Sequence, residues 1–317
     1  MVSVVIPVYN EEGSLEQLSQ RLHAALTSLG VEYEVIFVDD GSSDRSGEIM
    51  DQMCGQYGDN VKSIHFRRNF GKSIALKAGF SAAQGDVIVM MDADLQDQPE
   101  EISKLLNELN QKDLDAVSGW KEARKDSFSR RLFSRIFNSV MRKYSGVEIH
   151  DFNCGLKAFR KETIQGMVLY GQLHRFILLL VAEKGFKIGE VKVAHQKRPF
   201  GYSKYGAKRI YHGFLDFISI VFITRFLHSP LHFFGVMGIV CFLVSLVLAG
   251  YFCWLQVYAI LWNVPQHNLG NHPMWISTFF FFLAGLIFVC FGLLGALIVH
   301  LYYNQFNPSN NKQRPDR

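Results

Sequence analysis

The sequence predicts an α/β protein in which a doubly wound, mainly parallel sheet is followed by two membrane-spanning helices. Up to Gly119, short β-branched runs alternate with segments of helical period, the pattern of right-handed βαβ units. Nearly all charged residues come before position 226, and between Arg225 and Lys312 there is no Asp, Glu, Lys or Arg. That uncharged segment contains two apolar stretches, each long enough to cross a bilayer.

Composition narrows the class of protein further. The 317 residues are 49% hydrophobic and 20% charged, with a net charge of +4. The uncharged segment argues against a wholly soluble or disordered chain, and the polar remainder argues against a polytopic transporter. Five cysteines without CxxC spacing predict neither a disulfide framework nor a zinc site. The start has no signal-peptide pattern, so the polar part is expected to stay in the cytoplasm. Nucleic acid is not an expected partner.

The elements follow in order along the first part of the chain. The predicted strands are Val2–Val8, Tyr33–Val38, Val61–Phe66, Asp86–Met91 and Ala116–Gly119. Helices are predicted over Glu11–Leu29, after Asp44 as an N-cap, and over Lys72–Ala83. Pro99 suits the first turn of a further helix ending near Gln111.

The two apolar stretches predict a transmembrane hairpin. Leu231–Trp254 and Trp275–Tyr303 would be about 36 Å and about 43 Å long as helices, against an apolar bilayer core of about 30 Å. A buried hairpin in a soluble core is the alternative, which the absence of a polar face disfavours. Basic residues flank both ends, so both ends are expected in the cytoplasm. The predicted regions are a catalytic domain (1–203), an interfacial region (204–229), the hairpin (230–304) and a tail (305–317).

Acidic residues follow two of the predicted strands. Asp39 and Asp40 come after the second strand, and Asp92 and Asp94 come after the fourth. In parallel sheets, ligands bind at the carboxyl ends of the strands. The position of these carboxylates is therefore the first indication of function.

The Asp92-Ala93-Asp94 turn is a candidate site for Mg²⁺ or Mn²⁺. Two carboxylates one residue apart, with the Gln96 amide nearby, suit a hard cation that completes its shell with phosphate oxygens. A solvated acidic turn is the alternative. A calcium-binding EF-hand is excluded, because Asp97 stands where that loop needs Gly and Ser103 where it needs Glu.

Two glycine-containing segments are candidates for phosphate binding. Gly71-Lys72-Ser73 matches the end of a Walker loop, but Phe66 stands where the first Gly is required, so Lys72 is expected instead to begin a helix near the ligand. In the segment from Arg198 to Lys204, arginine, serine and lysine side chains surround Gly201 and would suit phosphate. An ordinary basic loop is the alternative.

Basic amphipathic segments lie further along the chain. Arginines and lysines between residues 124 and 143 alternate with apolar residues at helical spacing, which indicates either a solvated helix face or contact with phosphate or lipid headgroups. Lys204–Phe226 directly precedes the apolar stretches, so an interfacial helix is favoured there. Asp151 precedes an apparent strand over Gly155–Phe159, and catalytic and structural roles both stay open for it.

Together these motifs resemble the membrane-anchored GT-A glycosyltransferases of family 2 that use polyprenyl phosphate, such as dolichol-phosphate mannose synthases. The matching segments are residues 5–12 (VIPVYNEE), 38–44 (VDDGSSD), 68–72 (RNFGK), 92–99 (DADLQDQP) and 198–204 (RPFGYSK). The resemblance covers essentially the whole chain and looks strongest to the bacterial bactoprenol-phosphate glucosyltransferase branch.

The resemblance implies a role for individual residues. The nucleotide-sugar site would comprise Pro7, Tyr9, Glu11, Asp39, Asp40, Lys72, Asp92, Ala93, Ser203 and Lys204. The metal ligands would be Asp92, Asp94 and Gln96, and the catalytic residues Asp94, Asp151 and Arg198. Lys121 stands where many relatives have a phosphate-binding Arg, and Lys121, Arg131 and Arg135 would bind the lipid phosphate.

The implied reaction transfers a sugar, with glucose from UDP-glucose as first choice, to polyprenyl phosphate at the cytoplasmic face. Because a lipid monophosphate is already an anionic nucleophile, no general base is required, and direct displacement with inversion is expected. GDP-mannose-dependent transfer and a non-catalytic nucleotide-sugar-binding scaffold are the alternatives. A processive synthase is disfavoured because only two spans are available and no Arg-Trp pair occurs. Glycines 285, 292 and 295 would permit close helix packing, including packing between copies of the chain.

Overall fold

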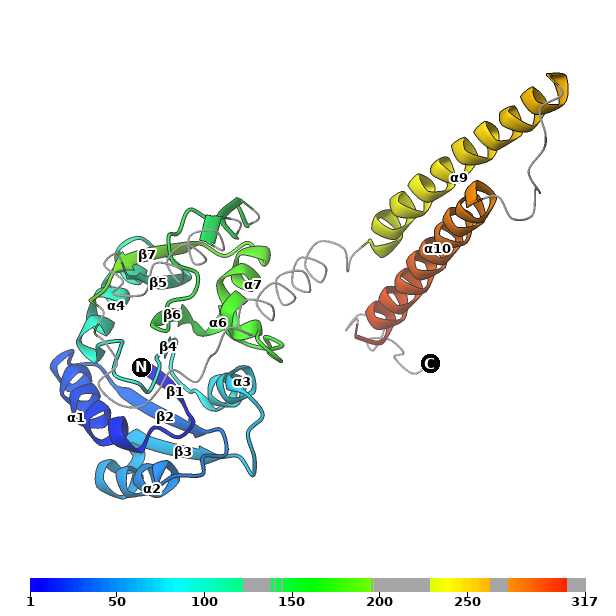
Figure 1. Cartoon of the computed structure of the whole chain (residues 1–317). Helices are drawn as coiled ribbons and strands as arrows, with labels where there is room; N and C mark the ends of the chain where they lie inside the picture. The colour runs from blue at the N-terminus through cyan, green and yellow to red at the C-terminus, as the bar shows by residue number, and fades with distance from the viewer. Residues whose placement is uncertain are drawn as a thin grey trace, which may run out of the picture. The chain divides into compact units, whose positions relative to one another are not determined.

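The computed structural model describes residues 1–121, 138–139, 141–143, 145–194, 196, 229–262 and 273–306 (Figure 1). The chain divides into two compact units, one within Met1–Asp216 and the other within Phe217–Arg317. Arg131, Arg135, Arg198, Ser203 and Lys204 lie outside the described residues, as does nearly all of the expected interfacial region.

The first unit is built on a seven-stranded sheet of order β3-β2-β1-β4-β6-β5-β7. Its strands are β1 (Val2–Val8), β2 (Tyr33–Asp39), β3 (Val61–His65), β4 (Val87–Met90), β5 (Ala116–Trp120), β6 (Lys157–Arg160) and β7 (Ile188–Lys192). Neighbouring strands are parallel, except that β6 runs antiparallel to both β4 and β5. The predicted mainly parallel sheet is confirmed, and β7 is an additional strand that the sequence pattern did not indicate.

Helices cover both faces of this sheet, as a doubly wound fold requires. They are α1 (Glu12–Ser28), α2 (Ser46–Tyr57), η1 (Gly58–Asn60), α3 (Lys72–Ala82), η2 (Pro99–Glu101), α4 (Ile102–Gln111), α6 (Lys161–Ile164), η3 (Leu173–Phe176) and α7 (Ile177–Glu183). Val4 and Ile6 of β1 share one core with buried residues of α1, α2 and α4. On the other face α3 packs so closely that a Cβ on Gly79 would overlap Val5.

Helix α2 begins one residue later than the predicted N-cap at Asp44 implies. Arg45, not Asp44, occupies the N-cap position of α2. The Asp44 carboxylate nevertheless accepts hydrogen bonds from the backbone N–H of Ser46, at 3.0 Å, and of Glu12, at 3.2 Å. It therefore ties the start of α2 to the start of α1, because the loops after β1 and β2 lie side by side.

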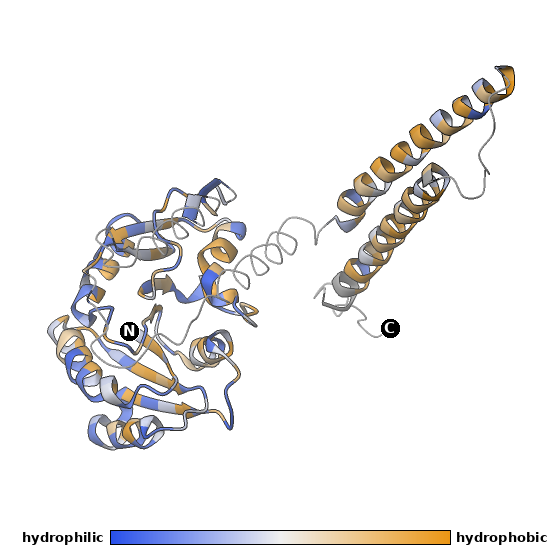
Figure 2. Ribbon diagram, in the orientation of Figure 1, coloured by the Kyte–Doolittle hydropathy of each residue, from blue (hydrophilic) through white to orange (hydrophobic). Residues whose placement is uncertain are grey.

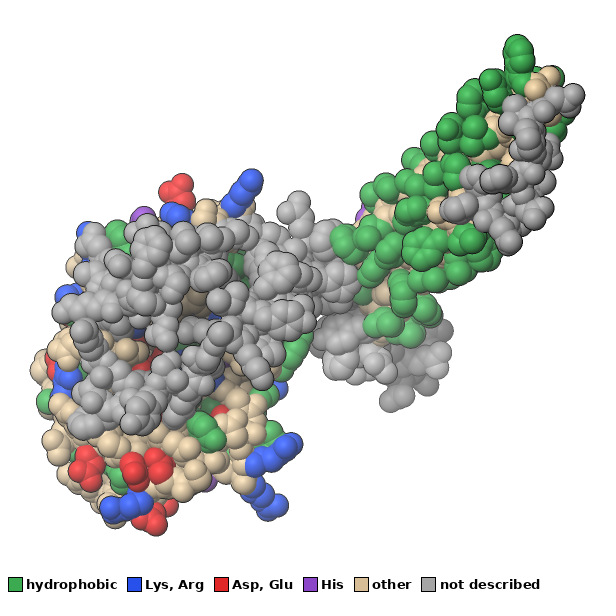
Figure 3. Space-filling model, in the orientation of Figure 1, with side chains coloured by type: hydrophobic (Ala, Val, Ile, Leu, Met, Phe, Trp, Pro, Cys, Tyr) green, Lys and Arg blue, Asp and Glu red, His purple; other side chains and the backbone are tan. Residues whose placement is uncertain are grey.

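The second unit contains two long apolar helices, α9 (Pro230–Leu261) and α10 (Pro273–Phe306), each of which begins at a proline. Apolar residues run along their whole length (Figure 2) and hydrophobic side chains cover their visible face (Figure 3). Both helices are long and apolar enough to cross a membrane.

Small residues bring α9 and α10 close together. A Cβ on Gly238 would be 2.8 Å from Val289, and a Cβ on Gly285 would be 2.8 Å from Phe242. The Ser245 hydroxyl donates a hydrogen bond to the carbonyl of Thr278, at 2.9 Å. Glycine in the second span thus serves packing within the hairpin.

Candidate active site at the carboxyl edge of the sheet

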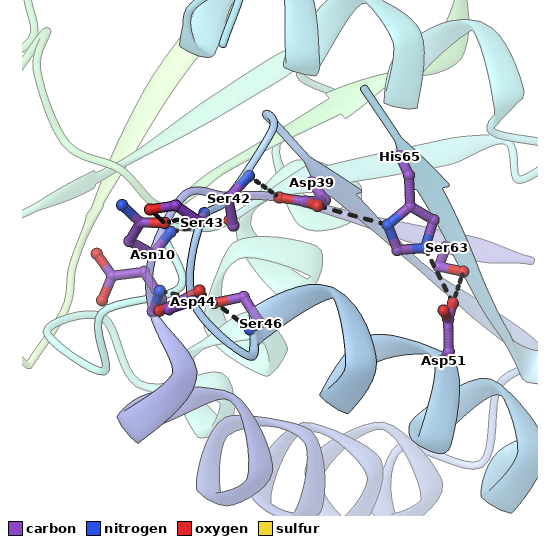
Figure 4. Close-up of polar contacts among 10 residues, drawn as sticks. Asn10, Asp39, Ser42, Ser43, Asp44, Ser46, Asp51, Ser63 and His65 are labelled. Atoms are coloured by element: carbon purple, nitrogen blue, oxygen red, sulfur yellow. Dashed lines mark hydrogen bonds and ion pairs between the residues drawn. The ribbon is translucent and has the colours of Figure 1, made fainter. Parts of the chain in front are cut away.

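The loops after β1 and β2 form one interlocked structure (Figure 4). Asn10 adopts a positive φ of 52°, and its backbone N–H donates to the Ser42 hydroxyl, at 2.9 Å. Its side-chain oxygen accepts from the Ser43 N–H, at 2.7 Å, and the Glu11 N–H donates to Ser46, at 2.9 Å. These contacts fix the carboxyl ends of both strands and the residues predicted to bind a nucleotide.

Asp39 and Asp40 are both buried, and each has a different set of partners. Asp39 accepts from the Ser42 N–H, at 2.8 Å, and its second oxygen lies 3.5 Å from Nδ1 of His65. His65 in turn contacts Asp51 through Nε2, at 2.9 Å (Figure 4).

Asp40 holds the start of α3. It accepts from the backbone N–H groups of Phe70, at 2.7 Å, and Gly71, at 2.9 Å. Burial raises the pKa of Asp40 above its ordinary value, although these N–H donors lower it. Gly41 is required beside it, because with a φ of 69° a Cβ there would overlap the backbone of Arg68.

The turn after β4 presents the Asp92 and Asp94 carboxylates. The Asp92 side chain is 31% exposed and forms an ion pair with Lys72, the first residue of α3. Burial alone would raise the pKa of Asp92, but the charge of Lys72 and its hydrogen bond lower it to about 2. Asp92 is therefore ionised at any physiological pH.

Asp94 lies in the same turn and is largely buried. One of its oxygens accepts from the Gln96 N–H, at 3.1 Å, and Leu95 between them has a φ of 58°. Ala93 between the two aspartates is buried and has no polar side-chain atom, so the side-chain ligand atoms of the turn come from its polar members. Oxygen donors of this kind suit a hard divalent cation, which usually keeps only one or two protein carboxylates and takes substrate phosphate oxygens. The residues present fit Mg²⁺ or Mn²⁺.

Lys121, at the end of β5, has a buried counter-ion. Its ammonium lies 2.5 Å from Asp97, and their side chains are 10% and 1% exposed. Burial would lower the pKa of Lys121, but Asp97 raises it above its ordinary value. Burial raises the pKa of Asp97. Sequence reasoning assigned Asp97 no role in the site, although its position three residues after Asp94 was a signal that could have found it.

The antiparallel direction of β6 brings a further segment to this edge. Because β6 runs against β4 and β5, the residues before it, including Asp151 and Gly155, lie where the parallel strands end. A Cβ on Gly155 would come within 2.5 Å of Asp97 and 2.7 Å of Asp92. Asp151 is buried, and its carboxylate accepts from the Asn153 N–H, at 3.1 Å.

Lys157 on β6 is a buried cation behind the site. Its side chain is 1% exposed and donates to the carbonyl of Cys154. Burial lowers the pKa of Lys157 and raises the pKa of the Cys154 thiol to about 12. Sequence reasoning missed this lysine, because a cation within a short apolar run resembles a surface position.

Most predicted site residues that the structure describes thus lie on neighbouring segments. Pro7, Tyr9 and Glu11 belong to the end of β1 and its loop, where Tyr9 is 37% exposed. Within the described part of the chain, no group of three or more His, Cys, Asp and Glu side chains could enclose a metal by itself. Two carboxylates from one turn at the carboxyl edge of the sheet are enough for a shared metal–phosphate site, which usually keeps only one or two protein carboxylates.

A family model described as "Glycosyl transferase family 2" matches residues 3–167. The chain belongs to glycosyl transferase family 2. Dodecaprenyl-phosphate galacturonate synthase from Rhizobium johnstonii is 34% identical to this transferase over 305 residues, which cover 95% of this chain and 88% of that protein. Undecaprenyl-phosphate 4-deoxy-4-formamido-L-arabinose transferase from Photorhabdus laumondii is 36% identical over 303 residues, with coverage of 95% and 89%. The resemblance to polyprenyl-phosphate glycosyltransferases is therefore confirmed, although neither printed name mentions glucose.

Solved structures confirm the fold of the transferase. Glucosyl-3-phosphoglycerate synthase from Mycobacterium tuberculosis in complex with UDP superimposes with a TM-score of 0.52 at 20% identity, covering 71% of this chain and 79% of that one. Its complex with Mn²⁺, UDP and phosphoglyceric acid gives a TM-score of 0.50 at 22% identity, with coverage of 63% and 72%. The fold is the predicted GT-A arrangement.

Proposed function

We propose that this family 2 transferase moves a sugar from a nucleotide donor to polyprenyl phosphate at a membrane surface, with inversion at the anomeric carbon. The observation that carries the proposal is the carboxyl edge of the sheet, where Asp92 pairs with Lys72, Asp97 pairs with Lys121, and both carboxylates approach Gly155. Curated relatives at 34% and 36% identity, both named for polyprenyl phosphates, supply the acceptor class.

Each part of the site has a role in this reaction. Asp39 and Asp40, with the β1 loop, would hold the nucleoside, and Asp92, Asp94 and Gln96 would hold Mg²⁺ or Mn²⁺. When bound, such a cation neutralises the charge that develops on the leaving diphosphate. A relative in fold was solved with Mn²⁺ and UDP, which supports a divalent cation here.

The acceptor needs positioning rather than deprotonation, because a phosphate monoester is already anionic near neutral pH. Lys121, Arg131 and Arg135 are proposed to bind its phosphate, and Arg198, Ser203 and Lys204 to close over the donor. In the described structure Lys121 already contacts Asp97, so binding of a phosphate would place this ammonium between two anions. Asp151 is proposed to assist catalysis from the segment before β6.

The membrane arrangement is part of the proposal. A catalytic domain over 1–203 would face the cytoplasm, an interfacial region over 204–229 would lie on the bilayer, and the hairpin over 230–304 would cross the inner membrane and leave the tail over 305–317 in the cytoplasm. The two apolar helices and the names of the relatives support this arrangement.

The sugar is the open choice within this function. UDP-glucose is the donor that the sequence resemblance favours, GDP-mannose is the alternative, and galacturonate and 4-deoxy-4-formamido-L-arabinose come from the relatives' names. The test incubates the purified full-length protein with undecaprenyl phosphate and each labelled nucleotide sugar in turn, followed by extraction into organic solvent. We expect the label from one donor to enter the organic phase, and Asp92→Asn to abolish that transfer. Label that binds the protein but never reaches the lipid would favour a nucleotide-sugar-binding scaffold.

A further inference from the structure

The start of α3 joins three separate segments through three consecutive residues. The Gly71 N–H donates to Asp40 after β2, and the Lys72 ammonium pairs with Asp92 after β4. Ser73 contacts His174 of η3, 101 positions further along the chain. The first two links belong to the proposed nucleotide site, whereas the third has no role there yet.

The Ser73–His174 contact is buried and consists of two hydrogen bonds. Ser73 is 0% exposed and His174 is 8% exposed. The Ser73 oxygen lies 2.9 Å from Nδ1 of His174 and 3.1 Å from the backbone nitrogen of the same residue. The arrangement is satisfied when the hydroxyl donates its proton to Nδ1 and accepts the backbone N–H, which requires Nδ1 to carry no proton.

The surroundings keep His174 neutral. Burial lowers its pKa well below 6.5, and the positive charges of Lys72 and Arg175 lower it further. A neutral imidazole matters at this place, because Lys72 already puts a cation at the positive end of the α3 dipole. A second charge beside it would oppose the alignment of Lys72 with Asp92.

We propose that the Ser73–His174 pair is a positioning device for Lys72, which fixes the first turn of α3 so that the ammonium stays beside the Asp92 carboxylate. This inference rests on the proposed function, in which Lys72 and Asp92 belong to the nucleotide-sugar site. His174 is a positioning residue, since it acts through Ser73 and the backbone of α3.

Local structure explains why such a device is needed. The N-cap residue of α3 is Gly71, which has no side chain to cap the helix and has a φ of 93°. A first turn whose N-cap residue contributes no side-chain bond depends on contacts from other segments to stay in place. Lysine also has a long, flexible side chain, so the position of its backbone decides how readily the Lys72 ammonium reaches Asp92. An anchor on Ser73, one residue further along, holds that backbone from outside the helix.

The central test is a double-mutant cycle in the full-length protein, with transfer to undecaprenyl phosphate as the readout. Ser73→Ala should lower kcat/KM by about tenfold, the scale of one misplaced charged group. In a Lys72→Met background the same substitution should change kcat/KM by less than about twofold, because its effect passes through Lys72. An equal fold-change in both backgrounds would overturn the proposal, as would an unchanged kcat/KM in the single variant.

Two substitutions of His174 separate positioning from mere filling of space. The amide oxygen of Asn occupies roughly the position of Nδ1, so His174→Asn should keep the hydrogen bond from Ser73 and retain activity within about threefold. His174→Gln places its amide further out and should lose about tenfold, like Ser73→Ala. Equal losses in the two variants, with equal thermal stability, would show that the bond to Nδ1 does not matter.

A second readout does not depend on transfer. Thermal unfolding of Lys72→Met, Asp92→Asn and the double variant gives the coupling between these two residues, measured in the wild-type and in the Ser73→Ala background. We expect the coupling to fall at least twofold when Ser73 is replaced, and an unchanged coupling would refute the positioning role. If the wild-type protein transfers no sugar from any donor, the proposed function fails, whereas this cycle still decides the inference.

Discussion

Replacing Gly155 by alanine adds one methyl group where two carboxylates approach the backbone. The new Cβ would lie 2.5 Å from Oδ2 of Asp97 and 2.7 Å from Oδ2 of Asp92, both well inside van der Waals contact. Neither oxygen can move freely, because Asp97 is buried against Lys121 and Asp92 is paired with Lys72. Overpacking of this kind costs about 1–3 kcal/mol. In a domain of this size that corresponds to a fall in Tm of roughly 2–4 °C for each kcal/mol.

The same substitution should impair transfer beyond its effect on stability. A displacement of the Asp92 carboxylate by a fraction of an ångström to about 1 Å would cost on the order of tenfold to a hundredfold in kcat/KM. The assay is transfer to undecaprenyl phosphate at a temperature well below the Tm of the variant. Gly55→Ala is the matched control, because nothing lies within 4 Å of its added Cβ, and within a helix it should stabilise by up to about 1 kcal/mol. A Gly155→Ala protein with wild-type Tm and wild-type activity would refute the close approach of the two carboxylates.

Three further predictions concern the stability contributed by Glu34, the divalent cation and the contact between His65 and Asp39. Burial would raise the pKa of Glu34, but hydrogen bonds from Lys62 and other donors hold it below 4.5. The contribution of Glu34 to stability is therefore present above pH 4.5 and is lost as the pH falls through this lowered pKa. Glu34→Gln should therefore lose about 1–3 kcal/mol at pH 7 and less at pH 4, as read from Tm across that range, and an equal loss at both would contradict the assignment. Chelation of divalent cations should abolish transfer, and added Mn²⁺ or Mg²⁺ should restore it. The Asp94→Ala variant should stay about a hundredfold less active with either metal. Full activity in the chelated protein would remove the metal from the mechanism. His65→Ala should raise the KM for the donor about fivefold with little change in kcat, since it releases Asp39, and an unaltered KM would show that His65 does not orient that carboxylate.

The sequence pattern was sufficient for the parallel half of the sheet. Runs such as Val2–Val8 are rich in β-branched residues because such strands are buried on both faces, and all five strands predicted up to Gly119 are present. The same pattern placed Lys72 correctly at the start of a helix. It could not predict β7, because Ile188–Lys192 is only partly buried and mixes polar and apolar residues.

The sequence predicted those residues of the candidate site that belong to local motifs. Asp92 and Asp94 follow a strand, and position alone identified them. Gly155 and His174 act through contacts with residues far away in the sequence, at separations that no local period records. Such partners become visible only when the segment before β6 is placed against the acidic turn and η3 against α3.

The close pairing of α9 and α10 has a consequence for the isoprenoid chain of the proposed polyprenyl phosphate acceptor. Where Gly238 and Gly285 bring the two backbones together, each glycine lies against the neighbouring helix and leaves no slot between them. An isoprenoid chain would therefore run along the outside of the pair, among the bilayer lipids. Because no passage between the helices is needed at that level, we expect the isoprenoid to reach the enzyme by lateral diffusion in the bilayer.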